Sequence, residues 1–401
     1  MTTRHISYNP RVLKEADALH AHGYEVSVVT INNHQAQWKF DEDLMRSRKW
    51  KLETVNFRRG REHTYWLYLS LKQKLFSWLS RITCRFGIAE RSINKAYDGL
   101  TRLAKKTRAD FYLVHHVEAL GAGFAAARRH KAAFGFDAED FHSGMSEFAV
   151  PSPSDDIIVY LESKYLPHCN YMTAASKGIA TAYHEKYGVP TPRVLLNVFP
   201  WEDLPAREVK EPVRFYWYSQ VIGPNRGLEL LLEAAGKIGL PGPAFEIHLR
   251  GSLYSDEYRD SLKAMANKGG IGNRLFFHEP ILAEDIVHDG NNFDVGMALE
   301  SPVSVNRNIC VTNKVFSYLM SRLLIIGTDT EGQKDIFSHF PDAVSICRVN
   351  DADEIAKAML FYINDKDQLK KAKMAAGAAV QNPFNWEWES KKLLHYISDI
   401  S

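Results

Sequence analysis

The chain has 401 residues, of which 45% are hydrophobic and 24% are charged, and its formal net charge is +2. This composition excludes a disordered or fibrous protein, and the length suits two globular domains better than one core. The four cysteines form no CxxC pair, so we expect neither a zinc site nor a disulfide framework, and a reducing compartment fits. Because there is no signal peptide and no apolar run of about 18 residues, we expect a cytoplasmic protein.

The N-terminal residues predict a helix and then a buried strand. Residues 10–21 have apolar positions at helical spacing, and EVSVVTI (25–31) has the β-branched composition of a buried strand. In an α/β domain such a helix normally follows a first strand, and residues 1–9 have little strand character. We therefore expect the first strand to be absent from this segment, or the gene start to be truncated.

The positive charge is concentrated in residues 46–108. This segment has 17 Lys or Arg against four Asp or Glu, a net +13, whereas the rest has 33 against 44, a net −11. Within it, the apolar residues of 65–86 fall on one helical face with basic residues along its edge. The face consists of Leu71, Leu75, Trp78, Leu79, Ile82 and Phe86, and its edge of Lys74, Arg81 and Arg85.

This pattern is typical of a helix that rests on an anionic membrane surface, so the protein could dock peripherally on the inner face of a membrane. The alternative is a core-packing helix with a solvated basic rim. The aromatic residues lie on the apolar stripe and are not interleaved with the charges as stacking platforms, so we expect no nucleic-acid partner.

Polar residues follow two successive strands of the first half. The strands 111–114 and 133–136 are each followed by ionisable side chains. The carboxyl ends of parallel strands meet at one edge of a sheet, where ligands bind. We expect ligand-binding side chains there, with a satisfied structural histidine as the alternative. They are His115, His116, Asp137, Glu139 and Asp140.

The second half begins with strand, turn and helix. Residues 202–212 are charged and contain prolines, so we read them as a linker. The run from Val213 has β-branched and aromatic residues, and apolar residues at helical spacing begin at Leu228. The turn between them contains Gly223, Asn225, Arg226 and Gly227. A helix start with an arginine is suited to a diphosphate, and an ordinary turn with a solvated arginine is the alternative.

Two further positions of the second half point to a ligand. Strand 293–299 is followed by Glu300, and Asn313 and Lys314 open a later helix. A lysine in the first helical turn is unfavourable because the N-terminal end of the helix dipole is positive. A bound anion beside it would compensate this repulsion. The alternative is a plain surface lysine. No DxD-like acidic pair follows a strand in this half, so a metal is not required.

The order of these motifs resembles the nucleotide-sugar-dependent glycosyltransferases of the B-type fold, within them the large retaining family 4. The resemblance covers nearly the whole chain. It rests on YNPRVLKEADALHAHGYEVSVVT (8–30), His115, FDAEDFH (136–142), YGV and LLNVFP within 187–200, SQVIGPNRGLELLLEA (219–234), LRG (249–251), TNKVFSYL and IIGTDTEGQ within 312–333, and WEWE (386–389).

The resemblance implies two Rossmann-like α/β domains facing across a cleft. The first, 1–204, binds the acceptor and is completed by a C-terminal helix, 384–401, that crosses back to it. The second, 212–383, binds the nucleotide sugar. The family's first strand and its Gly-rich loop have no counterpart here.

The resemblance also implies roles for single residues. His115 matches the strand-end histidine that approaches the transferred sugar, and Arg226 matches the basic residue that holds the donor diphosphate. With Lys314 these are the expected catalytic residues. Ser317 stands where many members have the glutamate that holds the donor ribose. The remaining expected donor-binding residues are Gly223, Asn225, Gly227, Arg250, Gly251, Glu300 and Asn313.

We therefore expect a retaining transferase that moves a sugar from a nucleotide sugar, UDP-sugar foremost, to a glycan or lipid-linked acceptor, with no cofactor and no metal. Arg226, Lys314 and helix N-termini would stabilise the charge of the leaving diphosphate. Two alternatives remain open at this point. One is a truncated or degenerate relative that binds nucleotide or sugar without turnover. The other is a sugar-nucleotide epimerase.

Overall fold

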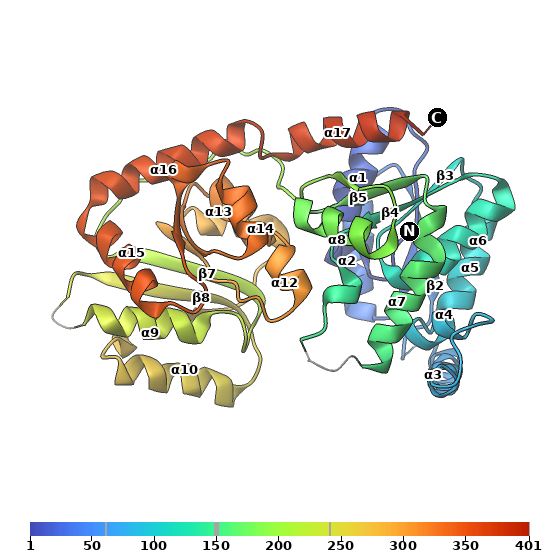
Figure 1. Cartoon of the computed structure of the whole chain (residues 1–401), viewed down its shortest axis with the longest axis horizontal. Helices are drawn as coiled ribbons and strands as arrows, with labels where there is room; N and C mark the ends of the chain where they lie inside the picture. Colours follow the sequence, from blue (N-terminus) through green and yellow to red (C-terminus); the bar gives the residue numbers. More distant parts are fainter. Residues whose placement is uncertain (61, 148–151, 240–241, 401) are drawn as a thin grey trace. The chain divides into compact units, whose positions relative to one another are not determined.

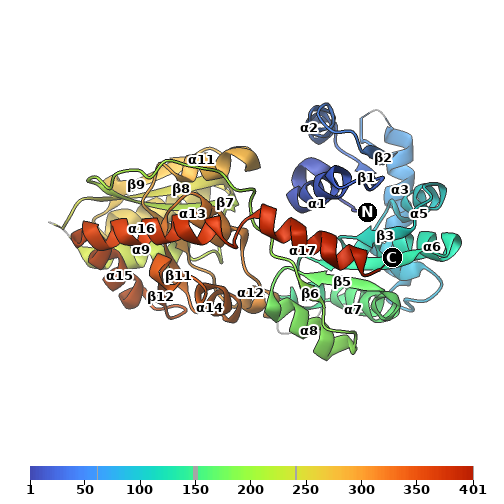
Figure 2. The same cartoon turned by 90° about the horizontal axis from the view of Figure 1, so that it is seen from above.

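The structure is a computed structural model that describes residues 1–60, 62–147, 152–239 and 242–400. The chain divides into two compact units, Met1–Leu196 with Ser390–Ser401, and Asn197–Glu389. In each unit parallel strands alternate with helices (Figure 1 and Figure 2). The expected α/β class with two Rossmann-like domains is confirmed.

The first unit has two parallel sheets. One pairs β1 (Ser27–Asn32) with β2 (Lys51–Asn56), and the other has the order β3 (Phe111–Val114), β4 (Ala133–Ala138), β5 (Tyr171–Ala174) and β6 (Arg193–Val194). Residues 1 and 2, which have no strand pattern, lie between the two sheets. Thr2 N donates to the carbonyl oxygen of Val29 on β1 at 3.1 Å, and His115 N donates to that of Met1 at 3.0 Å.

Helices cover these sheets. They are α1 (Pro10–Ala21), α2 (Gln35–Met45), α3 (His63–Leu79), α4 (Ile88–Ile93), α5 (Tyr97–Lys106), α6 (Leu120–His130), α7 (Pro153–Tyr165) and α8 (Lys177–Tyr187), with 3-10 turns η1 (Ile6–Tyr8), η2 (Val117–Ala119), η3 (His142–Gly144) and η4 (Leu166–His168). The structure has α1 as predicted, with Asn9 accepting a hydrogen bond from Val12 N at its start.

Helix α3 ends seven residues before the predicted apolar face does. Its C-cap is Ser80, whose hydroxyl donates to the carbonyl oxygen of Ser77. The β-branched pair Ile82 and Thr83 and the left-handed Gly87 disfavour continuation, so residues 80–87 form turns. Ile82 and Phe86 therefore lie beyond the helix.

The second unit contains one six-stranded parallel sheet. The order is β12 (Val344–Cys347), β11 (Leu324–Thr328), β10 (Val295–Ala298), β7 (Val213–Ile222), β8 (Phe245–Leu253) and β9 (Leu275–His278). Strand β7 is central and its Phe215 and Trp217 are fully buried in the core. The register of β7 against β8 shifts between Tyr218 and Val221, which is a β-bulge.

The helices of the second unit are α9 (Leu228–Ile238), α10 (Asp256–Lys268), α11 (Ile286–Gly290), α12 (Val305–Ile309), α13 (Asn313–Met320), α14 (Glu331–Phe337), α15 (Ala352–Asn364) and α16 (Lys366–Gln381), with 3-10 turns η5 (Gly272–Arg274), η6 (Ala283–Asp285) and η7 (Pro341–Ala343). Helix α17 (Trp386–Ser398) begins in this unit, and from Ser390 onward its residues belong to the first unit. None of the described helices combines the length and the hydropathy of a membrane-spanning segment.

Candidate functional site

The turn between β7 and α9 lies against the end of β10. Gly227 has φ +76°, and a Cβ atom there would lie 2.3 Å from the carbonyl oxygen of Leu299. Only glycine fits this approach, which brings the start of α9 beside Glu300. Arg226, the residue before Gly227, donates from Nη1 to the hydroxyl of Ser219 at 2.9 Å. The turn thus places the guanidinium of Arg226 at the carboxyl edge of the sheet.

Glu300 is buried at this edge among basic side chains. Its Oε1 accepts from Lys314 Nζ at 2.7 Å and its Oε2 accepts from Arg307 Nη1 at 2.7 Å. Burial alone would raise the pKa of this carboxyl, but the charges of Lys314, Arg307 and Arg226 hold it below its ordinary value. Three cations around one carboxylate leave an excess of positive charge, which suits a polyanionic ligand.

Lys314 lies in the first turn of α13, and its Nζ is 5.2 Å from the centre of the Trp217 ring. Two buried polar atoms, Thr312 Oγ1, two residues before Lys314, and Nε1 of the same Trp217 ring, have no hydrogen-bond partner among the residues described. Buried polar atoms in native proteins are nearly always satisfied, so these atoms point to a water or a ligand at the site.

The remaining residues predicted to bind a donor differ in their placement. Gly223 is buried, and Asn225 and Asn313 are exposed. Arg250 donates from Nε and Nη2 to the two carboxylate oxygens of Asp289, both at 2.7 Å. Its guanidinium is therefore already bound to an anion within the protein.

Gly251 and Ser317 have internal packing roles. A Cβ on Gly251, whose φ is +148°, would lie 2.3 Å from the carbonyl oxygen of Ser219. Ser317 is fully buried, and its hydroxyl hydrogen-bonds that of Tyr218 at 2.8 Å and donates to the carbonyl oxygen of Lys314.

A second cluster lies at the carboxyl edge of the β3–β6 sheet in the first unit. Asp137, at the end of β4, accepts two hydrogen bonds from Arg11 on α1, from Nε at 2.5 Å and Nη2 at 2.6 Å. Arg11 Nη1 also donates to the carbonyl oxygen of Leu195 at 2.8 Å. Burial would raise the pKa of Asp137, but the charge of Arg11 lowers it well below its ordinary value.

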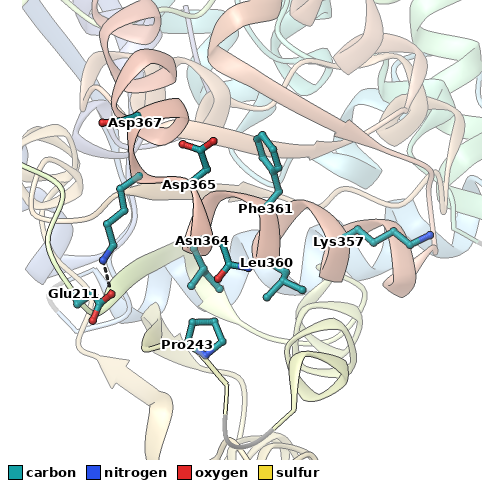
Figure 3. A pocket seen from close by; sticks show the side chains of 10 residues that line it. Glu211, Pro243, Lys357, Leu360, Phe361, Asn364, Asp365 and Asp367 are labelled. Atoms are coloured by element: carbon teal, nitrogen blue, oxygen red, sulfur yellow. Dashed lines mark hydrogen bonds and ion pairs between the residues drawn. The ribbon is translucent and has the colours of Figure 1, made fainter.

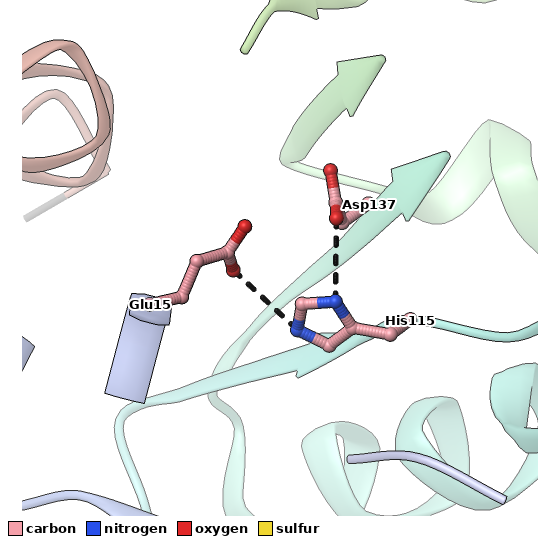
Figure 4. A group of neighbouring side chains, drawn as sticks. All are labelled: Glu15, His115 and Asp137. Atoms are coloured by element: carbon pink, nitrogen blue, oxygen red, sulfur yellow. Dashed lines mark ion pairs between the residues drawn. The ribbon is translucent and has the colours of Figure 1, made fainter. Parts of the chain in front are cut away.

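His115, which follows β3, lies between two carboxylates (Figure 4). Its Nδ1 is 3.2 Å from Asp137 Oδ2 and its Nε2 is 3.5 Å from Glu15 Oε2. Burial would lower the pKa of this imidazole, but the charge of Glu15 and the contact with Asp137 raise it to about 9. At neutral pH His115 is therefore an imidazolium, which can donate hydrogen bonds but cannot accept a proton.

Burial, followed by the negative charge of Asp137, raises the pKa of Glu15 to about 7. Glu139 contributes an oxygen 3.6 Å from His115 Nδ1. The neighbouring His116 differs, because its Nδ1 hydrogen-bonds the Thr2 hydroxyl at 2.9 Å and burial lowers its pKa to about 2. The structure thus brings His115, Asp137 and Glu139 together and leaves His116 neutral.

Asp140 lies beside this cluster, and its carbonyl oxygen accepts from the Tyr183 hydroxyl at 3.1 Å. Glu15, His115 and Asp137 each offer one ligand atom within 4.8 Å of the others, as a metal site requires. Arg11, however, binds both Asp137 oxygens and already supplies positive charge. A cation would have to displace this guanidinium, so the residues fit a metal poorly.

A hollow of about 710 Å³ lies elsewhere in the second unit, against α15 and the start of α16 (Figure 3). Its lining includes Glu211 and Pro243, which lie two residues before β7 and β8 respectively. The hollow is therefore at the amino ends of these strands, at the opposite edge of the sheet from Arg226 and Glu300. Its lining has no part in the cation cluster.

Sequence reasoning missed Arg11, Glu15 and Arg307. Arg11 and Glu15 are four residues apart on α1, adjacent to its apolar stripe, and this spacing was the available signal. Charged helix residues normally face solvent, so the signal is weak. Arg307 lies on the five-residue helix α12, which is too short for a periodic pattern.

No protein-family model matches the chain, and no curated protein matches it. Solved structures do. HepE from Anabaena in complex with UDP has a TM-score of 0.69 at 12% identity, with 99% of this chain and 98% of that chain covered. A glycosyltransferase from Rickettsia africae has a TM-score of 0.68 at 14% identity, covering 100% and 97%. The sucrose-phosphate synthase of Thermosynechococcus elongatus has a TM-score of 0.65 at 14% identity, covering 98% and 93%.

At these identities the likeness is one of fold. The chain has the two-Rossmann-domain B-type fold over its whole length, as its resemblance to the nucleotide-sugar-dependent glycosyltransferases implied. A fold by itself accommodates many chemistries. Function must therefore be inferred from the residues at the carboxyl edges of the two sheets.

Proposed function

We propose that this protein transfers a sugar from a nucleotide sugar to a glycan or lipid-linked acceptor. The observation that carries the proposal is the group of Arg226, Arg307 and Lys314 around Glu300 at the carboxyl edge of the second unit's sheet. Three cations against one carboxylate match the charge of a nucleoside diphosphate. The second unit would bind the donor and the first unit the acceptor.

The chemistry follows from the charge of the leaving group. As the bond between sugar and diphosphate breaks, negative charge grows on the diphosphate oxygens. Arg226, Lys314 and the N-termini of α9 and α13 would stabilise this charge, which is electrostatic catalysis without proton transfer. Fixed cations in this position make a metal unnecessary. Retention of configuration is part of the proposal on the strength of the resemblance.

UDP is the nucleotide we propose for the donor. HepE, which has the same fold, was solved with UDP and with UDP-glucose. In the first unit, His115, whose two ring nitrogens face Asp137 and Glu15, would act on the sugar through its positive charge. Glu139, the least buried carboxylate of the cluster, would accept a hydrogen bond from a sugar hydroxyl. His115 is then an orienting and electrostatic group, because it has no free lone pair at neutral pH.

One observation favours a second candidate, a relative that binds nucleotide without turnover. Ser317 is fully buried and hydrogen-bonds Tyr218, so its side chain is not positioned to hold a ribose. The epimerase alternative is weaker. It needs an acid or base that faces the sugar, whereas both oxygens of Glu300 are bound by Lys314 and Arg307, whose charges lower its pKa and make it a weak base.

Thermal melts of the full chain with UDP, GDP, ADP and CMP test the donor site. A ligand at 100 times its Kd adds about 2.7 kcal/mol to the free energy of unfolding. We expect a shift of Tm with UDP and smaller shifts with the others. If no nucleotide changes Tm, the donor-site proposal is wrong. Slow release of UDP from UDP-glucose in the absence of acceptor would separate the transferase from the non-catalytic binder.

A further inference from the structure

Helix α3 is apolar on two sides. Its inner side packs on α4, where Leu69 is buried and Gln73 Nε2 donates to the carbonyl oxygen of Ser92. On its outer side large apolar residues recur at spacings of three and four, and the turn after the helix exposes two more, Ile82 and Phe86. These six residues are called the stripe. The stripe and its exposed fractions are Tyr68 (55%), Leu71 (58%), Leu75 (54%), Trp78 (57%), Ile82 (71%) and Phe86 (88%).

A surface helix of a globular protein normally turns polar residues to solvent, and contiguous exposed apolar patches mark interaction sites. Figure 1 shows α3 at the periphery of the first unit, beside α4 and α5. The inner side of α3 already satisfies its packing within this unit. The outer stripe is therefore not needed for the packing of α3 within this unit, and its exposure indicates a binding partner.

The charge on this segment has one sign. Residues 63–89 contain four Lys or Arg and no Asp or Glu. Lys72 pairs with Asp98 of α5. Lys74, Arg81 and Arg85 are exposed, and none of them forms an ion pair with a carboxylate in the part of the chain that the structure describes. These three cations lie close in sequence to the stripe residues Trp78, Ile82 and Phe86.

We infer that the stripe, together with Lys74, Arg81 and Arg85, is a docking face for an anionic lipid bilayer. In a bilayer, the apolar side chains would enter the boundary between headgroups and acyl chains. The long basic side chains would extend to the lipid phosphates. Trp78 and Tyr68 are residue types that prefer this interface. The inference goes beyond sugar transfer and does not depend on it.

A second copy of the chain is a poorer occupant. A two-fold interface places the same patch on both sides, so Arg81 and Arg85 of one copy would meet those of the other. No acid within residues 63–89 would compensate them. A nucleic acid is also a poorer occupant, because the aliphatic residues Leu71, Leu75 and Ile82 offer bases no stacking surface.

Flotation of the full chain with lipid vesicles tests the inference. Vesicles of phosphatidylcholine alone are compared with vesicles that contain about one third phosphatidylglycerol. We expect the protein to float with the anionic vesicles, to stay largely unbound with the neutral ones, and to be released as the salt concentration rises. Because the probe is lipid alone, the result is independent of any glycosyltransferase assay.

Two double variants separate the apolar and the charged contributions. Arg81→Gln/Arg85→Gln removes two cations, and since each contributes about fivefold to binding, the partition coefficient should fall roughly 25-fold. Leu75→Ser/Trp78→Ser removes two stripe residues and should lower partitioning by a similar factor. Both pairs are exposed, so Tm should change little. Matched controls are Lys370→Gln/Lys371→Gln and Phe361→Ser/Met374→Ser, exposed residues of the second unit.

Each outcome decides the inference. Flotation with anionic vesicles that both α3 double variants lose and both controls keep would support it. No flotation, or equal flotation of variants and controls, would overturn it. A dimer in sedimentation that Leu75→Ser/Trp78→Ser dissociates would assign the stripe to a second copy. Tight binding of single-stranded RNA that Arg81→Gln/Arg85→Gln abolishes would assign it to nucleic acid. Either result would also overturn the lipid assignment.

Discussion

Arg11 and Asp137 are 126 positions apart in the chain, yet the guanidinium of Arg11 binds both carboxylate oxygens of Asp137. Both side chains are buried, and His115 and Glu15 contact the same pair. A helix that precedes β1 is thereby fixed to the end of β4. The cluster at the carboxyl edge of the β3–β6 sheet is one network in which each charge depends on the others.

Removing one partner of this network should be costly. In Arg11→Met, Asp137 would remain buried without its main compensating charge, so we expect the free energy of unfolding to fall by about 3–5 kcal/mol. Arg48→Met is the matched control, because Arg48 pairs with Asp17 at a half-exposed site and should cost about 1 kcal/mol or less. Urea unfolding measures both. Equal losses would show that the Arg11 pair contributes no more than a surface pair.

The raised pKa of His115 makes stability depend on pH. Between the ordinary value of 6.5 and about 9, the folded state binds a proton that the unfolded state has lost. The stabilisation is therefore complete below pH 6.5 and is lost as pH rises through 9, with a slope of at most about 1.4 kcal/mol per pH unit. His115→Gln should remove this slope from urea unfolding measured between pH 7 and 9.

His116→Gln is the control for that experiment. The pKa of His116 is about 2, so in the folded state its imidazole is neutral throughout pH 7–9 and contributes no slope there. A wild-type slope that survives in His115→Gln, or one that vanishes in His116→Gln, would contradict the assignment of the charge to His115. Comparing variants cancels the titrating groups outside this cluster, whereas Glu15, whose pKa the charge of His115 lowers, shifts with the substitution.

The diphosphate assignment predicts a specific loss of nucleotide affinity. Arg226→Ala removes a charge-assisted contact of about 1.5–3 kcal/mol and should raise the Kd for UDP roughly 10- to 100-fold. Arg214→Ala is the control, since Arg214 lies at the amino end of β7, away from the cation cluster. Isothermal titration of UDP measures both. Unchanged affinity in Arg226→Ala would remove this residue from the donor site.

Two glycines of the same turn should respond differently to alanine. Gly227→Ala would force a Cβ to within 2.3 Å of the Leu299 carbonyl at positive φ, so we expect a loss of about 2 kcal/mol or more. At Gly223 the nearest atom would be 3.4 Å away, an ordinary contact, and we expect a loss below about 1 kcal/mol. Thermal melts without ligand compare the two. Tolerance of Gly227→Ala would contradict the close approach of the turn to β10.

The sequence was most informative where a single periodic pattern decides the structure. Helix α1 and the start of α9 at Leu228 follow from apolar spacing, and the strands β3 and β4 follow from their composition. Their carboxyl ends were expected to bring His115 near Asp137, and the structure has these side chains 3.2 Å apart. Local chemistry and the general rule for parallel sheets were sufficient for this contact.

The rest depends on distant partners that no local pattern specifies. Arg11 and Glu15 have the composition of a solvated helix face, and only the packing of α1 on the sheet buries them. Arg250 and Asp289 are 39 positions apart, and only the fold brings them into contact. Helix α2 and strand β2, between residues 35 and 56, were missed because their apolar residues are few and irregular.

The bulge in β7 constrains how the turn that carries Arg226 can be redesigned. It moves Ser219 out of regular pairing, and the space for it exists only because position 251 of the neighbouring strand has no side chain. A deletion of one residue at 219–220 would restore regular pairing but turn the following side chains to the opposite face of the sheet. The loop 219–227 and Gly251 must therefore be transferred together into another protein of this fold, although some 24 positions separate them in the chain. A chimera that exchanges the loop alone would misdirect Arg226.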